Sequence, residues 1–317
     1  MSRHWITLTE HILKEEQKFP KATGSLTLLL TQIAETSKII ASHVKNSGLI
    51  NIEGLSGKRN VYEEEVKKLD EFSNDLLVEI LSESGQVYAI ASEELEKPLF
   101  TKNSKAEYAI FFDPLDGSSN VDNNNPLGTI FSIYKKSKNF LQKGKEQVAA
   151  GYVLYGTSVM FVYSCGGSVN GFTLDPSIGS YLLSHENIKI PERGKVYGIN
   201  EGNFELFDKQ TQRFLTSLKQ GKPYRLRYAA CMVADVHRFL IEGGIFMYPK
   251  DASAPSGKLR LMFEVNPMAY IITKAGGMAL TTTDDPLNIS PSNLHQRTPV
   301  VLGSPHEVRT FLKFHKS

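Results

Sequence analysis

The sequence predicts a mixed α/β fold of layered sheets and helices, and three observations support this. First, the chain of 317 residues is long enough for about two domains of average size. Second, two segments near its start repeat apolar residues at helical spacing, and the chain then changes to short runs rich in β-branched and aromatic residues. Third, strand-like and helical segments alternate in the second part, which favours layered sheets over a helix bundle.

Two helices are predicted first, over residues 25–46 and 61–84. Their leucine, isoleucine and valine side chains recur at three- and four-residue intervals. Gly48 is expected to end the first helix and Gly85 the second, because glycine commonly follows a helix C-terminus. Residues 49–60 carry charges and glycines without any periodicity, so we expect a mobile loop there.

Strands are expected next, because six short runs are rich in β-branched and aromatic residues. These runs span residues 87–91, 108–112, 129–134, 150–155, 159–163 and 171–174. A polar segment at 190–195 is the expected boundary between an N-terminal domain, residues 1–191, and a C-terminal domain, residues 192–317. Beyond it we expect strands at 196–199, 245–248 and 278–281, and helices at 231–242, 267–274 and 305–314.

Composition narrows the class of protein. The 36 basic and 34 acidic residues give a net charge of +2, which provides no overall field for holding a nucleic-acid backbone. Cys165 and Cys231 are too few for a disulfide framework and suggest a reducing compartment. The most apolar stretch, 148–163, is too short and interrupted to cross a bilayer, and the first twenty residues lack the apolar core of a signal peptide. We therefore expect a cytoplasmic protein with no nucleic-acid or membrane partner.

Several catalytic motifs are absent from the sequence. It contains no G-x-x-x-x-G-K-[ST] phosphate loop, no G-x-S-x-G nucleophile elbow, and no H-E-x-x-H or C-x-x-C pattern. Neither cysteine is followed by arginine at the spacing of a cysteine phosphatase, and the D-x-D of aspartyl-phosphate enzymes is missing. A covalent phosphoenzyme of either kind is therefore not expected.

Acidic residues are concentrated before and after the first predicted strand. Residues 63–97 hold eleven acidic residues and three basic ones. Those at four-residue spacing on the second helix, such as Glu71 and Glu79, fit an exposed helix face. Glu93 and Glu94 are different, because they follow an apolar strand and adjacent carboxylates repel each other unless a cation or a proton separates them.

The next strand ends in the sequence D-P-L-D-G-S-S-N, residues 113–120. Gly117 can adopt the turn conformation that brings a backbone close to a ligand. Asp113 and Asp116 then converge at a sheet edge with a backbone carbonyl, and the N–H groups that follow can meet an anion. A helix starting near Ser119 would add a favourable dipole for phosphate. Such oxygen ligands suit Mg²⁺ or Mn²⁺, whereas D-x-x-D-G does not match the EF-hand spacing.

The pair E-E followed by D-P-L-D-G-S-S resembles the lithium-sensitive, magnesium-dependent sugar and inositol phosphatases. Further segments are similar to class I fructose-1,6-bisphosphatases and occur in that family's order. They are V-K-K-L-D (66–70), F-D-P-L-D-G-S-S-N-V-D (112–122), V-A-A-G-Y-V-L-Y-G (148–156), N-E-G (200–202), M-V-A-D-V-H-R (232–238), G-G-I-F-M-Y-P (243–249), G-K-L-R-L (257–261) and N-P-M-A-Y (266–270). The resemblance implies a five-layer α-β-α-β-α sandwich of two domains, with the active site in the cleft between them.

The resemblance also implies a metal site and a catalytic acid pair. The implied metal ligands, for two or three Mg²⁺ ions per subunit with Mn²⁺ as an alternative, are Glu93, Asp113, Asp116, Glu264 and the Leu115 carbonyl. Asp70 and Glu94 match the acids that position and deprotonate the attacking water. Glu64 matches the carboxylate of the family's mobile loop, which is usually an aspartate.

Substrate residues are carried over in the same way. The resemblance implies that Gly117, Ser118, Ser119 and Arg260 hold the departing phosphate, and that Asn200, Arg227, Tyr228, Tyr248 and Lys258 hold the 6-phosphate and the sugar. The residue that matches Arg227 reaches across from a neighbouring subunit in the family, so a homotetramer is implied. Asp235, His237 and Arg238 belong to a family motif, but we expect them to have structural roles.

This chain departs from the family pattern at several positions. Asn203 replaces a common tyrosine near the 6-phosphate, and Glu53 replaces the loop aromatic. Residues Thr23, Gly24, Leu26, Thr27 and Tyr108 resemble the family's AMP-inhibition site. The basic residue expected before that tyrosine is Glu107, and an expected arginine is Lys135, which loses bidentate recognition of phosphate. We therefore expect inhibition by AMP to be weakened or lost.

The function implied is Mg²⁺-dependent hydrolysis of fructose 1,6-bisphosphate to fructose 6-phosphate in gluconeogenesis, by in-line attack of an activated water. Two alternatives remain at this point. A sedoheptulose-1,7-bisphosphatase, or an enzyme for both sugars, would share the mechanism, and Asn203 leaves this possible. A catalytically silent sensor of sugar phosphates or AMP is the second, although every implied acidic ligand is present. An inositol or nucleotide phosphatase would lack most of these segments.

Overall fold

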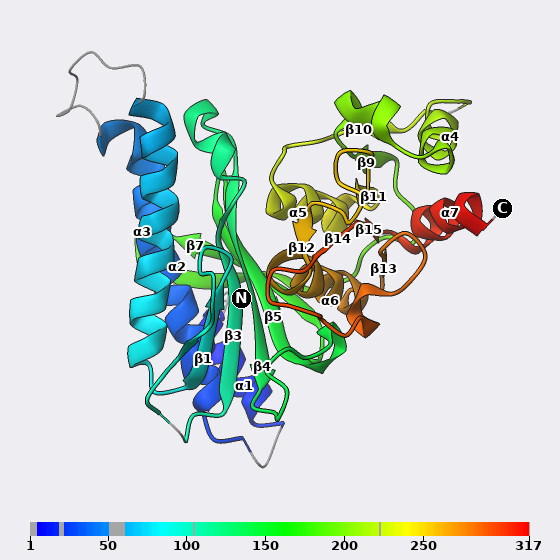
Figure 1. Ribbon diagram of the computed structural model, residues 1–317. Helices are drawn as coiled ribbons and strands as arrows, with labels where there is room; N and C mark the ends of the chain where they lie inside the picture. The colour runs from blue at the N-terminus through cyan, green and yellow to red at the C-terminus, as the bar shows by residue number, and fades with distance from the viewer. Residues whose placement is uncertain (1–4, 19–21, 51–60, 104, 222, 317) are drawn as a thin grey trace.

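The computed structural model describes residues 5–18, 22–50, 61–103, 105–221 and 223–316, excepting the side chains of 48–50 and 61–68. Two sheets separated and flanked by helices make up the molecule (Figure 1). Among the helices of these described residues, none combines the length and apolar character needed to cross a membrane.

The larger sheet has eight strands. In spatial order they are β2 (Leu99–Phe100), β1 (Val87–Ser92), β3 (Tyr108–Asp116), β4 (Leu127–Lys135), β5 (Gln147–Tyr155), β6 (Val159–Ser164), β7 (Val169–Asp175) and β8 (Ser180–Ile188). Only the β1 and β3 pair is parallel among these neighbours. The central strands β3 and β4 are buried along nearly their whole length, because helices cover both faces of the sheet.

The smaller sheet lies in the C-terminal part of the chain. Its five strands, in spatial order, are β10 (Arg225–Leu226), β9 (Val196–Gly198), β11 (Ile245–Tyr248), β15 (Val300–Gly303) and β13 (Met278–Leu280). A separate pair, β12 (Leu259–Arg260) and β14 (Arg297–Thr298), runs beside it. Short helical turns occur in both parts of the chain: η2 (Ser118–Asn123) and η3 (Gly144–Glu146) lie between strands of the larger sheet, and η4 (Glu201–Leu206), the π-helical η5 (Leu261–Val265) and η6 (Pro286–Asn288) lie in the C-terminal part.

In the part of the chain that the structure describes, seven α-helices complete the layers: α1 (Leu8–Glu16), α2 (Ser25–Ile50), α3 (Val61–Glu83), α4 (Lys209–Leu218), α5 (Met232–Glu242), α6 (Asn266–Lys274) and α7 (Pro305–Lys316). Neighbouring residues of β4 show how the layers form, because their side chains point to opposite faces. Phe131 packs with residues of α1–α3, and Ile130 packs with residues of α5 and α6. Helices α4 and α7 cover the far face of the smaller sheet. The order is therefore α-β-α-β-α, as expected (Figure 1).

The structure differs from the expected elements at a few points. Helix α2 continues through Gly48 to Ile50: one interior glycine costs a helix only about 1 kcal/mol, so glycine does not have to end it. Helices α1 and α4 and strand β8 were not expected: they are short or carry many polar residues, so their periodicity is weak. Residues 51–60, expected to form a mobile loop, lie outside the described residues, as does Glu53. The boundary at 191/192 stays a prediction.

Candidate active site

Two parallel strands end side by side and bring their acidic residues together. Ser92 of β1 is paired with Phe112 of β3, and the backbone N–H of Glu93 donates to the Phe112 carbonyl at 3.0 Å. Glu93 and Asp113 therefore lie next to each other. A third carboxylate, Glu264, comes from the π-helical η5 in the C-terminal part, and one oxygen from each of the three lies within 4.8 Å of the others. Such a set of oxygen atoms matches the ligand preference of Mg²⁺ or Mn²⁺.

Burial and mutual repulsion dominate the electrostatics of this cluster. Asp113 and Glu264 are each 6% exposed. Desolvation and the neighbouring charge of Glu93 raise the pKa of both carboxyls well above their usual range. The Arg260 guanidinium lies 2.5 Å from a Glu93 oxygen, and the Arg260 backbone N–H donates to Glu264 at 2.6 Å. Because Arg260 faces only part of this charge, the cluster fits a divalent cation, which would neutralise the rest.

A β-bulge separates Asp113 from Asp116. Asp113 is opposite Ile130 and Asp116 is opposite Gly128, so β3 contains one extra residue at this point. The bulge is held locally, because the Leu115 N–H donates to Asp113 Oδ1 at 3.0 Å and the Thr129 hydroxyl donates to the Pro114 carbonyl at 2.9 Å. The two aspartates consequently meet different partners.

Asp116 lies near the three clustered carboxylates, and one of its oxygens contacts the beginning of α5. Its Oδ2 accepts the Val233 N–H at 2.7 Å and the Cys231 thiol at 3.0 Å. Burial raises the pKa of Asp116, while the hydrogen bonds from α5 oppose that shift. The sequence reasoning placed Asp116 with the metal ligands and missed its contact with Cys231, which depends on two segments more than a hundred residues apart.

A second pair of acids borders the cluster. Asp70 projects from α3, accepts a hydrogen bond from the Ser118 side chain, and has its pKa raised to about 7 by burial and by the charges of Glu94 and Glu93. Burial and the charge of Glu93 also raise the pKa of Glu94. A carboxylate whose pKa lies near neutral pH can accept a proton efficiently there. Glu64 belongs to the same helix, but its side chain is outside the described residues.

The turn after Asp116 has the geometry of an anion site. Gly117 has φ +77° and ψ 26°, and a Cβ atom there would lie 2.7 Å from the Cys231 Cβ. Only glycine fits this position without strain. Ser118 and Ser119 follow at the start of η2, a 3₁₀-helix of six residues. The helix considered near Ser119 is thus a short 3₁₀ turn, and its backbone N–H groups are the donors available to an anion.

The residues expected to hold the sugar lie on several segments of the C-terminal part. Arg227 is exposed just after β10, and its backbone N–H donates to the Tyr197 carbonyl at 2.8 Å. Tyr228 forms a hydrogen bond with Tyr248 at the end of β11. Asn200 caps η4, because its side-chain oxygen accepts the Gly202 N–H at 3.1 Å.

Lys258 and Asn203 both contact the carboxylate of Asp251. The Lys258 ammonium lies 3.6 Å from Asp251 Oδ2, and the Asn203 amide donates to the same oxygen at 3.3 Å. Ser253 and Ala254 donate to the other oxygen of Asp251. Asn203, which stands where a tyrosine was expected, is therefore linked through Asp251 to Lys258, the lysine expected at the 6-phosphate.

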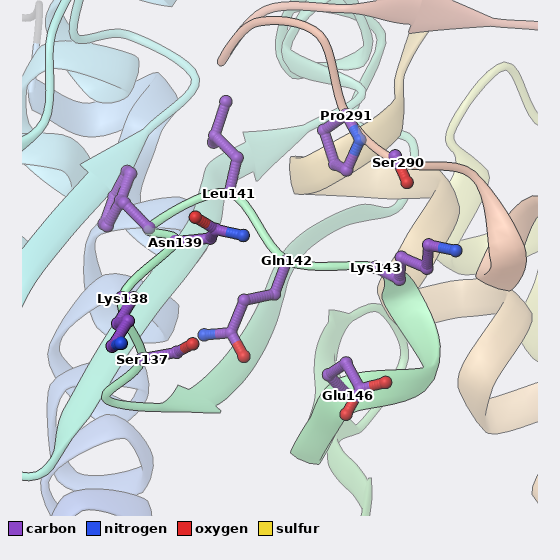
Figure 2. Close-up of a pocket in the computed structure, with 10 residues that line it drawn as sticks. Ser137, Lys138, Asn139, Leu141, Gln142, Lys143, Glu146, Ser290 and Pro291 are labelled. Atoms are coloured by element: carbon purple, nitrogen blue, oxygen red, sulfur yellow. The ribbon is translucent and has the colours of Figure 1, made fainter.

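A cavity of about 520 Å³ lies between the first two helices and the larger sheet. Its lining includes all five residues expected at an AMP site, together with Glu107 and Lys135. The Thr27 hydroxyl donates to a Glu16 carboxylate oxygen at 2.6 Å, which brings a further negative charge to the start of α2. A hollow of about 700 Å³ between residues 137–146 and Ser290–Pro291 contains none of the expected site residues (Figure 2).

Comparison with known proteins gives one consistent family. The model of the N-terminal domain of fructose-1,6-bisphosphatase matches residues 6–186, and the model of its C-terminal domain matches residues 190–316. The chain is 52% identical over 314 residues to the class 1 fructose-1,6-bisphosphatase of Sulfurihydrogenibium sp. (strain YO3AOP1), covering 97% of each chain. It is also 52% identical over 320 residues to the class 1 enzyme of Persephonella marina, covering 99% of each.

Solved structures agree with these sequence comparisons. The chain superposes on the crystal structure of Leishmania major fructose-1,6-bisphosphatase in holo form with a TM-score of 0.90 and 38% identity. The superposition covers 99% of this chain and 100% of that one. For the T-state structure of the same enzyme the TM-score is 0.91 at 37% identity.

Proposed function

The chain belongs to the class 1 fructose-1,6-bisphosphatase family, and we propose that it hydrolyses the 1-phosphate of fructose 1,6-bisphosphate to give fructose 6-phosphate and phosphate. The observation that carries this proposal is the cluster of Glu93, Asp113 and Glu264 beside the acid pair of Asp70 and Glu94. The names of the relatives favour the fructose substrate over sedoheptulose 1,7-bisphosphate.

Glu93, Asp113 and Glu264 are proposed to hold Mg²⁺, and Asp116 and the Leu115 carbonyl would complete the site. The site would take two or three Mg²⁺ ions, and Mn²⁺ could replace them. Bound divalent cations would neutralise charge on the phosphate oxygens and lower the pKa of the attacking water. The donor set supports this, because its buried carboxylates have raised pKa values that a cation would relieve.

The remaining residues of the site orient the water and the phosphate. Asp70 and Glu94 would hold the attacking water and accept its proton, and Glu64 is proposed as a third acid of this group. Backbone N–H groups of the Gly117 turn, with Ser118, Ser119 and Arg260, would bind the departing phosphate. Binding at the distant phosphate would position the reacting one, so that part of the binding energy lowers the barrier.

Several wider features belong to the same proposal. Asn200, Tyr228, Tyr248 and Lys258 would bind the sugar and 6-phosphate, with Arg227 supplied by a neighbouring subunit of a homotetramer. The exposed position of Arg227 supports this assignment. The two free cysteines fit a cytoplasmic enzyme. We also propose that AMP inhibits weakly or not at all, because Glu16 and Glu107 line the cavity that would receive its phosphate.

The direct test is phosphate release from fructose 1,6-bisphosphate with and without Mg²⁺, with sedoheptulose 1,7-bisphosphate as the comparison substrate. We expect cation-dependent release that is faster from the fructose substrate. Release only from the sedoheptulose substrate would change the proposed substrate. No release from either substrate with Mg²⁺ or Mn²⁺ would refute the proposed activity.

A further inference from the structure

One backbone unit, Ala229, is held from both sides by buried side chains. The Asn120 amide donates to the Ala229 carbonyl at 2.9 Å, and the Asp235 carboxylate accepts the Ala229 N–H at 2.8 Å. Asn120 is 6% exposed and Asp235 is 1% exposed. Asn120 lies in η2, the turn proposed to bind the 1-phosphate, whereas Asp235 lies in α5. The two side chains therefore meet at a single residue, and the bond from Asn120 links the N-terminal part of the chain to the C-terminal part.

The segment around Ala229 has a conformation that needs such support. It connects β10 to α5, and Ala230 has φ +57°, a left-handed conformation that is unfavourable for a residue with a Cβ atom. Asn120 also donates to the Pro126 carbonyl at 3.1 Å, so the same amide holds the far end of its own turn. The chain between β10 and α5 is thus kept in one conformation by contacts with the turn of Asn120.

The segment held in this way carries residues of the other phosphate site. Tyr228 immediately precedes Ala229 and is proposed to bind the 6-phosphate and the sugar of the same subunit, whereas Arg227, one residue earlier, is proposed to serve the site of a neighbouring subunit. Just beyond, the Cys231 Cβ packs against Gly117 so closely that a Cβ there would be 2.7 Å away. The phosphate turn and the sugar-binding segment are consequently fastened together at two neighbouring points.

We propose that Asn120 and Asp235 are positioning residues that set the distance between the two phosphate sites by clamping Ala229, and so make the enzyme selective for a bisphosphate of the correct length. This inference rests on the proposed function. Two phosphate sites discriminate between substrates only if their separation is fixed, because a flexible site adapts to several lengths. Weakening the hydrogen bonds to Ala229 should therefore lower kcat/KM little for a substrate with one phosphate and more for a substrate with two.

The experiment compares kcat/KM for fructose 1,6-bisphosphate and fructose 1-phosphate, which lacks the distant phosphate. We expect Asn120→Ala to lower the preference for the bisphosphate by at least about tenfold, because it removes the hydrogen bonds to the Ala229 and Pro126 carbonyls. Asp235→Ala should do the same, whereas Asp235→Asn keeps an oxygen that accepts the Ala229 N–H and should restore most of the preference. If Asn120→Ala folds poorly, the comparison of Asp235→Ala with Asp235→Asn tests the proposal on its own.

The matched control is Asn170→Ala. Asn170 is 4% exposed, accepts the Asn187 N–H at 2.8 Å, and lies in β7 rather than in the phosphate turn. This control should leave the substrate preference unchanged. If the Asn120 and Asp235 variants lower both efficiencies equally, or neither, the positioning role is wrong. If the wild-type enzyme releases no phosphate, the proposed function itself is refuted. Failure of the positioning role and failure of the proposed function therefore give different results.

Discussion

Asp113 lies beside Glu93 because two parallel strands end at the same edge of the sheet, and their carboxylate oxygens meet a third from Glu264 within 4.8 Å. Glu264 comes from the C-terminal part of the chain, so the cluster forms only when the two parts pack together. The contact of Arg260 with Glu93 has the same origin. The catalytic chemistry proposed here is therefore a property of the junction between the two parts.

Asp113→Asn should reduce phosphate release by at least about a thousandfold, because it removes a charged ligand from the cluster. The affinity for Mn²⁺, measured by titration calorimetry, should fall in parallel. Glu96→Gln is the control, since Glu96 is an exposed acid three residues beyond Glu93. Retention of both activity and Mn²⁺ affinity in Asp113→Asn would contradict the assignment of this cluster.

Asp70→Asn should lower kcat by about 10²–10⁴-fold with a small change in KM, because a proton acceptor acts in the chemical step. The pKa of Asp70 is about 7, and the acid must be deprotonated to work. Wild-type activity should therefore fall as the pH drops through this range, and the variant should lose that limb of the pH profile. Asp75→Asn, an exposed position on the same helix, should behave as wild type.

The protein without divalent cations should lose stability as the pH rises from about 5 towards 8. Burial raises the pKa of Asp113 and Glu264, so the folded state binds protons more tightly than the unfolded state over this window. Stability then falls with rising pH until the raised pKa values are passed. At pH 7.5 the free energy of unfolding of Asp113→Asn should exceed that of the wild type by on the order of 1 kcal/mol, and this difference should be smaller at pH 5.

Urea unfolding in the presence of a chelator measures this effect. Addition of Mn²⁺ should stabilise the wild type at pH 7.5 and stabilise Asp113→Asn much less, because binding to the folded state alone raises stability. A stability difference between the two proteins that is the same at both pH values would count against mutual repulsion as its cause.

AMP should inhibit the wild-type enzyme weakly, because Glu107 and Glu16 place negative charge in the cavity beside Thr27. Glu107→Lys reverses one of these charges, so it should lower the AMP concentration for half-inhibition by at least about tenfold. Adenosine, which lacks the phosphate, should show no such change. Strong inhibition of the wild type at low micromolar AMP would overturn this prediction.

Gly117→Ala should lower both stability and activity. The added Cβ requires a left-handed backbone and would lie 2.7 Å from the Cys231 Cβ, so the turn and the start of α5 must move apart. We expect a loss of about 2–4 kcal/mol in the free energy of unfolding. Gly179→Ala also has a positive φ but has open space around it, and so measures the backbone cost alone. Equal losses in the two variants would show that the contact with Cys231 is unimportant.

Features that depend on local patterns could be predicted from the sequence alone. Helical spacing indicated α2 and α3, and runs rich in β-branched and aromatic residues indicated β1, β3 and β4, although β3 extends four residues beyond its predicted end. Acidic residues directly after two apolar strands indicated a site at the end of the sheet. These predictions were possible because side-chain periodicity and turn chemistry act over a few residues.

Contacts between side chains that are far apart in the sequence became known only from the tertiary structure. It turns Asp116 towards Cys231 and Val233, brings Glu264 to Glu93, and clamps Ala229 between Asn120 and Asp235. Such contacts join residues that lie far apart in the chain, and their free energy comes from burial and hydrogen bonding between packed layers, which no local pattern in the sequence encodes.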